Sequence, residues 1–193
     1  MRQSPALAPA FTLALLLPAT ALADPIDGRT ARDLLYRDVA TEVVTVDVSG
    51  LSAQEVTVLT TVVQTQKYYA AVAFAPDAGI MAEPTVLAAN HHAVEFARTA
   101  ALDGCNARRS GGRACVIALE LRPTGWEERA LSLSADATAA FDSDYRGMGR
   151  RAFAVSLASG QWGIGRGRDA AEEALNTCRA DSDVSDCAVI IAD

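Results

Sequence analysis

The chain has 193 residues, of which 50% are hydrophobic and 21% are charged, and its formal net charge is −7. This proportion of hydrophobic residues is ordinary for a globular protein and higher than a disordered chain shows. The negative charge repels phosphate backbones and anionic membrane surfaces, so we expect no nucleic-acid partner and no binding to such membranes.

The first 23 residues have the three zones of a cleavable secretory signal peptide. Arg2 gives a positive start, residues 10–17 form a short apolar run, and residues 21–23 (Ala-Leu-Ala) have the small-x-small pattern that signal peptidase recognises. The run is shorter than the about 20 residues of a membrane-spanning helix. We therefore expect cleavage after Ala23, no membrane span in the mature chain, and a periplasmic or secreted location. The removed segment carries one Arg and no acidic residue, so the mature net charge becomes −8.

Residues 24–40 are interpreted as an N-terminal arm, and the rest of the chain contains two similar units. Four segments of the first unit reappear in the same order in the second, at offsets of 82, 81, 73 and 72 residues. They are Leu51-Ser52-Ala53 with Leu133-Ser134-Ala135, Ala71-Val72-Ala73-Phe74 with Ala152-Phe153-Ala154-Val155, Ala101-Leu102 with Ala174-Leu175, and Cys115-Val116-Ile117 with Cys187-Ala188-Val189. A duplication followed by one deletion gives such a pattern. It predicts repeat units at residues 41–123 and 124–193.

Hydrophobic patterning predicts four strands in the first unit, at residues 41–48, 68–75, 80–87 and 115–121. A helix is predicted to begin at the capping box that Ser52 forms with Glu55. A second helix is expected to be capped by Asn90 and to run to about residue 107.

The second unit is shorter but has the same predicted order. Its elements are a strand with Leu131 and Leu133, a helix over 134–141, a hairpin over 151–158 and 162–166, a helix capped by Asp169 with Glu172 in the capping-box position, and a closing strand over 187–191. The predicted fold class is therefore α+β. We expect two tandem βαββαβ-like units with antiparallel or mixed sheets and helices on one face.

Four cysteines in an exported chain favour two disulfides, although their number alone leaves three connectivities open. In each predicted unit one cysteine ends a helix and the other starts the next strand. The repeat therefore predicts the pairs Cys105–Cys115 and Cys178–Cys187. A disulfide that closes so short a loop stabilises a protein by about 2–3 kcal/mol.

This strand–hairpin–helix–Cys–loop–Cys–strand pattern resembles a class of small exported bacterial domains of unknown function. Residues 68–121 and 151–193 carry the resemblance, through an Ala-rich strand, an Ala-rich helix that ends in Cys, and a second Cys before an apolar strand. The resemblance implies an envelope location and disulfides, and it implies no activity. Members of the class have been labelled aminolevulinate synthase, but such an enzyme needs a Schiff-base lysine, and Lys67 is the only lysine in this small chain.

His91 and His92 are the only histidines and are expected in an exposed first helical turn, where Glu95 offers a weak pairing. Neighbouring helical residues point about 100° apart, so the two rings are unsuited to sharing a metal. We expect no metal site, no cofactor and no catalytic residue here, and both histidines are retained as possible ligand or anion contacts. Replacing both histidines by alanine should then change stability by no more than about 0.5 kcal/mol.

Residues 163–168 (Gly-Ile-Gly-Arg-Gly-Arg) precede a predicted helix, where an anion could bind beside Arg166 and Arg168. The spacing matches neither dinucleotide-binding nor P-loop motifs, and the alternative is a Gly-rich hairpin arm.

The chain lacks the G-x-S-x-G and H-E-x-x-H motifs, and paired cysteines are not available as nucleophiles. We interpret the protein as a non-catalytic binding or interaction module of the envelope, with a protein or small-molecule partner that the sequence does not identify. The alternative is a small hydrolase-like periplasmic enzyme with a site between the units. A cleft lined by His91, Tyr68, Tyr69 and Trp162 would favour ligand binding or catalysis, and a smooth charged surface would favour a protein partner.

Overall fold

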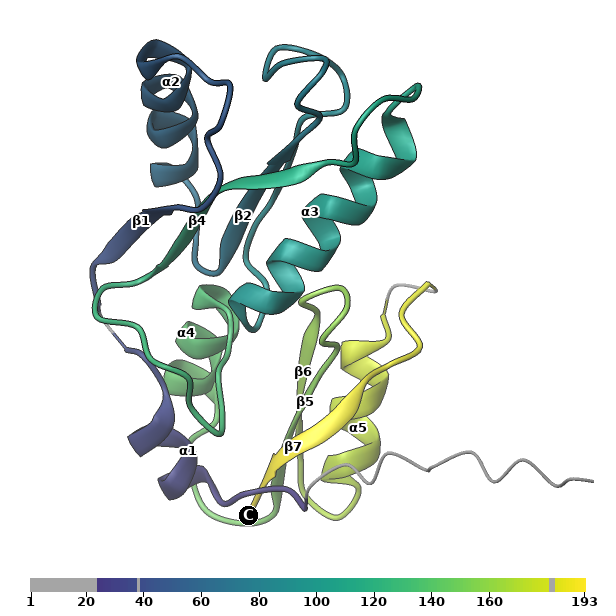
Figure 1. The fold of residues 1–193 in the computed structure, drawn as a ribbon. Coiled ribbons are helices and arrows are strands. Elements are labelled where there is room, and N and C mark those ends of the chain that lie inside the picture. The colour runs from purple at the N-terminus through teal and green to yellow at the C-terminus, as the bar shows by residue number, and fades with distance from the viewer. Residues whose placement is uncertain (1–23, 38, 181–182) are drawn as a thin grey trace, which may run out of the picture.

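The computed structural model describes residues 24–37, 39–180 and 183–193, so the predicted signal peptide lies outside the described residues. The chain forms two lobes, each built on an antiparallel sheet with helices against it (Figure 1). The fold is therefore α+β, as predicted. Among the described residues, no helix combines the length and the apolar character needed to cross a membrane.

The first lobe contains a four-stranded sheet with the strand order β1-β4-β2-β3. Its elements are β1 (Thr41–Thr45), α2 (Ala53–Gln64), β2 (Ala70–Phe74), β3 (Val86–Ala88), α3 (Val94–Arg108) and β4 (Val116–Pro123). The capping box of Ser52 and Glu55 begins α2 as predicted. The strand expected over 80–87 is wrong in extent, because turns occupy most of that segment and only the three residues of β3 pair with β2.

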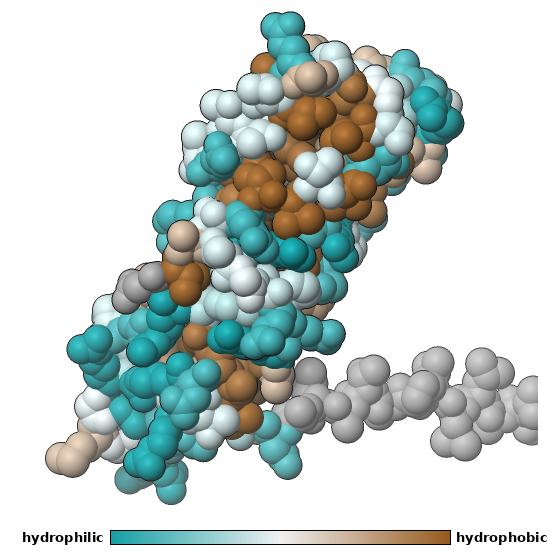
Figure 2. Space-filling model, turned by 60° about the vertical axis from the view of Figure 1, so that its left-hand side comes forward, coloured by the Kyte–Doolittle hydropathy of each residue, from teal (hydrophilic) through white to brown (hydrophobic). Residues whose placement is uncertain are grey.

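The second lobe contains a three-stranded sheet with the order β6-β5-β7. Its elements are α1 (Gly28–Leu34), α4 (Ala135–Asp144), β5 (Arg151–Val155), β6 (Trp162–Arg166), α5 (Ala170–Cys178) and β7 (Ala188–Ala192). The hairpin of β5 and β6 and the closing strand are confirmed. In Figure 2 apolar side chains gather on the upper lobe, which is the first lobe, where Val46, Val58 and Val62 are 45–48% exposed.

Helices cover both faces of each sheet, so the expected placement on one face is wrong. All five side chains of β2 are buried, with Ala71 and Ala73 facing α3 and the alternate residues Val72 and Phe74 facing α2. In the second lobe the alanines of β5 face α5, and its larger apolar residues face α1 and α4. A middle strand that is apolar throughout needs cover on both faces.

The two sheets share their pairing pattern. β2 pairs with β3 and β4, and β5 pairs with β6 and β7. Each middle strand also has one register shift, between Val72 and Ala73 in the first lobe and between Phe153 and Ala154 in the second. These positions correspond at the offset of 81 residues seen in the sequence. The topologies agree in this part, and the common origin of the units stays a prediction.

The second lobe differs because, within residues 24–37, 39–180 and 183–193, β7 has no counterpart of β1 beside it. The strand expected at Leu131 and Leu133 is wrong: both side chains are buried in the core, but their backbone joins no strand. The outer edge of β7 is instead met by the N-terminal arm, where Ile26 forms a single parallel bridge with Ile191. The arm continues into α1, and Ala31 packs in the core of the second lobe.

Two of the expected helix caps are also wrong. α3 begins after Ala93, and Asn90 has instead a left-handed backbone (φ 60°) and an amide that donates to Asp136 at 2.9 Å. Asp169 occupies the cap position of α5 but makes no capping hydrogen bond with its side chain, so the capping box with Glu172 does not form.

Candidate functional site

The two lobes meet where the segment before α3 contacts the start of α4 and the turn between β5 and β6. The Ala135 N–H donates to the Tyr68 carbonyl at 3.1 Å, and Asp136 accepts hydrogen bonds from Lys67 and Asn90. The turn approaches the first lobe closely at Gly160, where a Cβ atom would lie 2.8 Å from the Asn90 carbonyl oxygen. Gly160 also has φ +77°, so both its backbone and its surroundings favour glycine.

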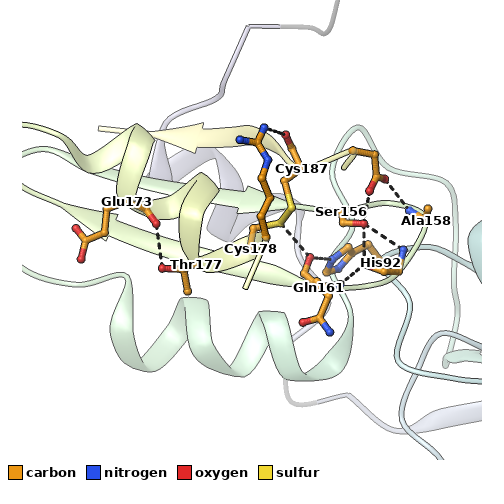
Figure 3. The surroundings of a disulfide bond; sticks show 11 residues. His92, Ser156, Ala158, Gln161, Glu173, Thr177, Cys178 and Cys187 are labelled. Atoms are coloured by element: carbon orange, nitrogen blue, oxygen red, sulfur yellow. Dashed lines mark hydrogen bonds between the residues drawn. A yellow bond between two sulfur atoms is a disulfide. The ribbon is translucent and has the colours of Figure 1, made fainter. Parts of the chain in front are cut away.

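His92 lies at the centre of this junction and is fully buried. Its Nδ1 accepts the Ser134 N–H at 3.1 Å, and its Nε2 lies 3.0 Å from the Gln161 carbonyl oxygen (Figure 3). Because Nδ1 accepts, the ring proton belongs on Nε2, which donates to Gln161. Burial lowers the pKa of His92 to about 4, so the ring is neutral at neutral pH. His92 therefore joins the lobes as a buried hydrogen-bonding group.

The Gln161 carbonyl oxygen also accepts the Ser156 N–H at 2.8 Å and lies 3.8 Å from the Cys178 sulfur. A disulfide sulfur carries no proton, so this last approach is a van der Waals contact. The carbonyl thus places His92 next to the disulfide of the second lobe, as Figure 3 shows.

His91 is also buried, with 7% of its surface exposed, and its Nδ1 has no hydrogen-bond partner among the described residues. Burial lowers the pKa of His91 as well. The expected exposed helical turn is wrong, because this segment runs extended beside Tyr69 before α3 begins. The expectation that replacing both histidines would barely change stability loses its basis, because it assumed exposed side chains and both are buried. Within the described part of the chain, no group of three or more His, Cys, Asp or Glu could hold a metal ion.

In the described part of the chain, His91, Tyr68, Tyr69 and Trp162 do not line one common cleft, which is the arrangement that would have favoured ligand binding or catalysis between the units. Tyr69 lines a cavity with Trp126, whereas Tyr68 lines a different one with Val39 and Thr138. Trp162 is stacked on Phe153, with ring centres 5.7 Å apart, in the second lobe. The sequence pattern identified the junction of the lobes as a place with cavities, but not which side chains line each cavity.

The cavity at Tyr69 is termed the junction cleft and has a volume of about 130 Å³. Its lining residues are Tyr36, Tyr69, Ala93, Glu95, Trp126, Glu127, Glu128, Arg129 and Ser132. They come from the end of the arm, the start of β2, the first turn of α3 and the connection between the units. Sequence reasoning missed this cleft, although an aromatic residue followed by two acidic ones in a connecting segment was a signal for it.

Internal hydrogen bonds hold the walls of the junction cleft. The Tyr36 hydroxyl accepts the Glu127 N–H at 2.8 Å, and the Arg129 guanidinium lies 3.7 Å from the centre of the Tyr36 ring. Tyr69 is 1% exposed, and this burial raises its pKa far above the usual value. The aromatic side chains are therefore fixed in place.

A second cavity, the β7 groove, has a volume of about 150 Å³ beside the outer edge of β7. It is mainly apolar and is lined by Asp24, Ile26, Ala130, Leu131, Ala188, Val189 and Ile190. Ile26 occupies part of the strand edge, where its N–H donates to Ile190 and its carbonyl accepts from Ala192. Among the described residues, no strand continues this pairing along Ala188 and Val189.

The two arginines expected beside an anion have different surroundings. The Arg166 guanidinium donates to the carbonyl oxygens of Arg146 and Asp144, so it is engaged within the protein. Arg168 is exposed and lines a depression with Arg150 at the start of α5. An anion beside Arg168 stays a prediction.

The structure confirms the predicted disulfides Cys105–Cys115 and Cys178–Cys187. Each links the last turns of a helix to the residue before the following strand. No protein-family model, curated protein or solved structure matches the chain.

Proposed function

We propose that the mature chain is an exported, non-catalytic binding module that holds a protein partner along the open edge of β7. The observation that carries this proposal is the β7 groove, an apolar cavity beside a strand edge that a single residue, Ile26, bridges. An extended segment can add to such an edge through main-chain hydrogen bonds, while neighbouring pockets receive alternate side chains.

The chemistry of the edge supports this use. Exposed strand edges are usually protected by charged residues, by proline or by another element. The first lobe follows that rule, since β1 covers β4 and itself carries Glu42 and threonines. β7 has the sequence Ala-Val-Ile-Ile-Ala, with no charge and no proline. The exposed main-chain groups of such an edge can pair with another extended chain.

An oxidising compartment fits the proposal. Disulfides form and persist mainly outside the cytosol, and the predicted signal peptide and the resemblance to small exported bacterial domains lead in the same direction. A periplasmic or secreted location is therefore part of the proposal.

The alternative of a hydrolase-like enzyme between the units finds less support. A general base must reach the proton that it removes from a substrate or water. His92 has both ring nitrogens engaged inside the protein and is fully buried. The neighbouring His91 is also buried, with 7% of its surface exposed.

The proposal is tested by placing a photo-crosslinking residue at Ala188 of the mature protein in its native envelope. We expect an adduct that mass spectrometry assigns to an extended, uncharged segment of one partner protein. The matched control carries the crosslinker at Met81, which is 88% exposed in the first lobe. A folded Ala188 variant that gives no more adduct than the Met81 variant would refute the proposed partner site.

A further inference from the structure

The junction cleft combines aromatic and acidic side chains in a small cavity. Three of its lining residues are aromatic (Tyr36, Tyr69 and Trp126) and three are glutamates (Glu95, Glu127 and Glu128), against a single arginine. A cavity needs about 10–15 Å³ on the same measure to hold one water molecule, so about 130 Å³ accommodates a small head group rather than a large ligand. The lining therefore favours a ligand that is both small and positively charged.

The cleft carries negative charge that the protein does not neutralise. Arg129 lies 3.7 Å from the Glu127 carboxylate, which accounts for the one basic residue of the lining. Glu95 and Glu128 form no ion pair with any of the described residues. Two carboxylates thus remain to balance a positive charge brought by a ligand.

The aromatic residues of the cleft already hold cations over their rings. The Arg129 guanidinium lies 3.7 Å from the centre of the Tyr36 ring, and Arg122, which does not line the cleft, lies 5.1 Å from that of Trp126. Such contacts use the negative potential of the ring face, which also attracts ligand ammonium groups. Because the Tyr36 hydroxyl accepts the Glu127 N–H, the segment that carries Trp126 and Glu128 is held beside the cleft before a ligand arrives.

We propose that the junction cleft binds a small organic cation through its ammonium or quaternary ammonium group. Trp126 and Tyr69 contact the cation, and Glu95 and Glu128 supply the opposite charge. A bare metal ion suits the cleft less well, because aromatic walls offer it no ligands and metals such as calcium take six to eight oxygens. The net negative charge of the chain also raises the local concentration of cations. This inference is independent of the partner site at β7, since the two cavities share no lining residue.

The test compares choline with 3,3-dimethyl-1-butanol, which has the same shape but no charge. The purified mature protein is titrated with each compound, with tryptophan fluorescence and the melting temperature as readouts. We expect saturable binding of choline with a dissociation constant of about 1 mM, and a melting temperature that rises with its concentration. The neutral compound should give neither effect.

Variants locate the binding. Trp126→Ala should weaken choline binding about tenfold, and the double variant Glu95→Gln, Glu128→Gln should weaken it comparably while it preserves the size of the side chains. Glu172→Gln, on α5 and outside the cleft lining, is the matched control and should bind like the wild type.

Three outcomes would overturn the proposal. They are equal binding of choline and the neutral compound, no saturable binding of choline by the folded wild type, and choline binding that the glutamine double variant leaves unchanged. The glutamine variant keeps the test decisive even if Trp126→Ala fails to fold.

Discussion

Each lobe has its own middle strand with one register shift, and each has its own disulfide. The lobes differ at the outer edge of the closing strand. β4 pairs with β1 over five residue pairs, whereas the outer edge of β7 meets, among the described residues, only the bridge of Ile26. The difference leaves an apolar groove in the second lobe where the first has a covered edge. The comparison teaches that, among the described residues, the closing strand keeps an open apolar edge in the lobe where no strand like β1 pairs with it.

The lobes also differ in how the cystine-bearing helix contacts the neighbouring strand. In the first lobe the glycine is on the helix, where a Cβ at Gly104 would lie 3.3 Å from a methyl group of Val86. In the second lobe the glycines are on β6, and a Cβ at Gly165 would lie 1.9 Å from the Ala170 carbonyl oxygen. The second contact is made by backbone, which does not move aside as a side chain can.

The largest expected effect tests this difference in packing. Gly165→Ala should lower the free energy of unfolding by about 3 kcal/mol or more, because β6 and α5 must separate to admit the methyl group. The matched variant Gly104→Ala should stay within about 1 kcal/mol of the wild type, since the gain in helix propensity offsets a tight contact with Val86. Urea unfolding followed by circular dichroism measures both. Similar losses in the two variants would show that the helices pack equally closely in the two lobes.

The next effect tests whether His92 makes the stability of the protein sensitive to acid. The pKa of His92 is about 4 in the folded protein and about 6.5 when unfolded. Between these values the unfolded chain binds a proton that the native protein does not. Stability is therefore greatest above pH 6.5 and falls on acidification, by about 3 kcal/mol in total near pH 4.

The non-titrating variant His92→Gln separates this effect from other acid-sensitive groups. Urea midpoints measured from pH 7 to pH 4.5 should fall less steeply in the variant than in the wild type. The lowered pKa of His91 contributes in the same direction, so a residual slope is expected. Parallel curves for the wild type and the variant would show that His92 does not control the acid sensitivity of the junction.

The disulfides give an effect of intermediate size that should be alike in the two lobes. The paired residues are 10 apart in the first lobe and 9 apart in the second, so both close loops of nearly the same length. Replacing either pair by alanine should lower the free energy of unfolding by about 2–3 kcal/mol, because the unfolded chain regains freedom. Calorimetry of the Cys105→Ala, Cys115→Ala and the Cys178→Ala, Cys187→Ala variants measures this. A loss confined to one pair would break the equivalence of the lobes.

Local patterns predicted the middle strands, the disulfides and the start of α2, because alternation, cysteine position and a capping box act within a few residues. The burial of His92 was not predictable in this way. Its partners Ser134 and Gln161 lie 42 and 69 residues further on, so its surroundings exist only once the lobes meet. Two histidines followed by a glutamate three and four residues later resemble an exposed helical turn.

The strand expected at Leu131 and Leu133 shows a second limit. Alternating leucines indicate that side chains are buried, and these are. Whether the backbone also joins a sheet depends on which segment reaches the neighbouring edge, and Ile26 bonds to β7 there. The junction cleft escaped prediction for a similar reason, since its walls come from four separate segments.

The smallest effects test the helix caps, where the sequence repeat pairs Ser52 with Ser134. Ser52 is exposed and accepts the Glu55 N–H, whereas Ser134 is fully buried and accepts the Ala137 N–H at 3.2 Å. Ser52→Ala should cost about 1 kcal/mol, because water can replace the hydroxyl. Ser134→Ala should cost about 2 kcal/mol, because the N–H is left buried without its acceptor.

Asp169→Ala provides the control for both caps. Asp169 occupies the cap position of α5 but its side chain makes no capping hydrogen bond, so its replacement should change stability by less than about 0.5 kcal/mol. Thermal unfolding of the three single variants in one buffer gives the order Ser134, Ser52, Asp169. If Asp169→Ala cost as much as Ser52→Ala, the side chain of Asp169 would cap α5 in solution, and the start of that helix would match the sequence pattern after all.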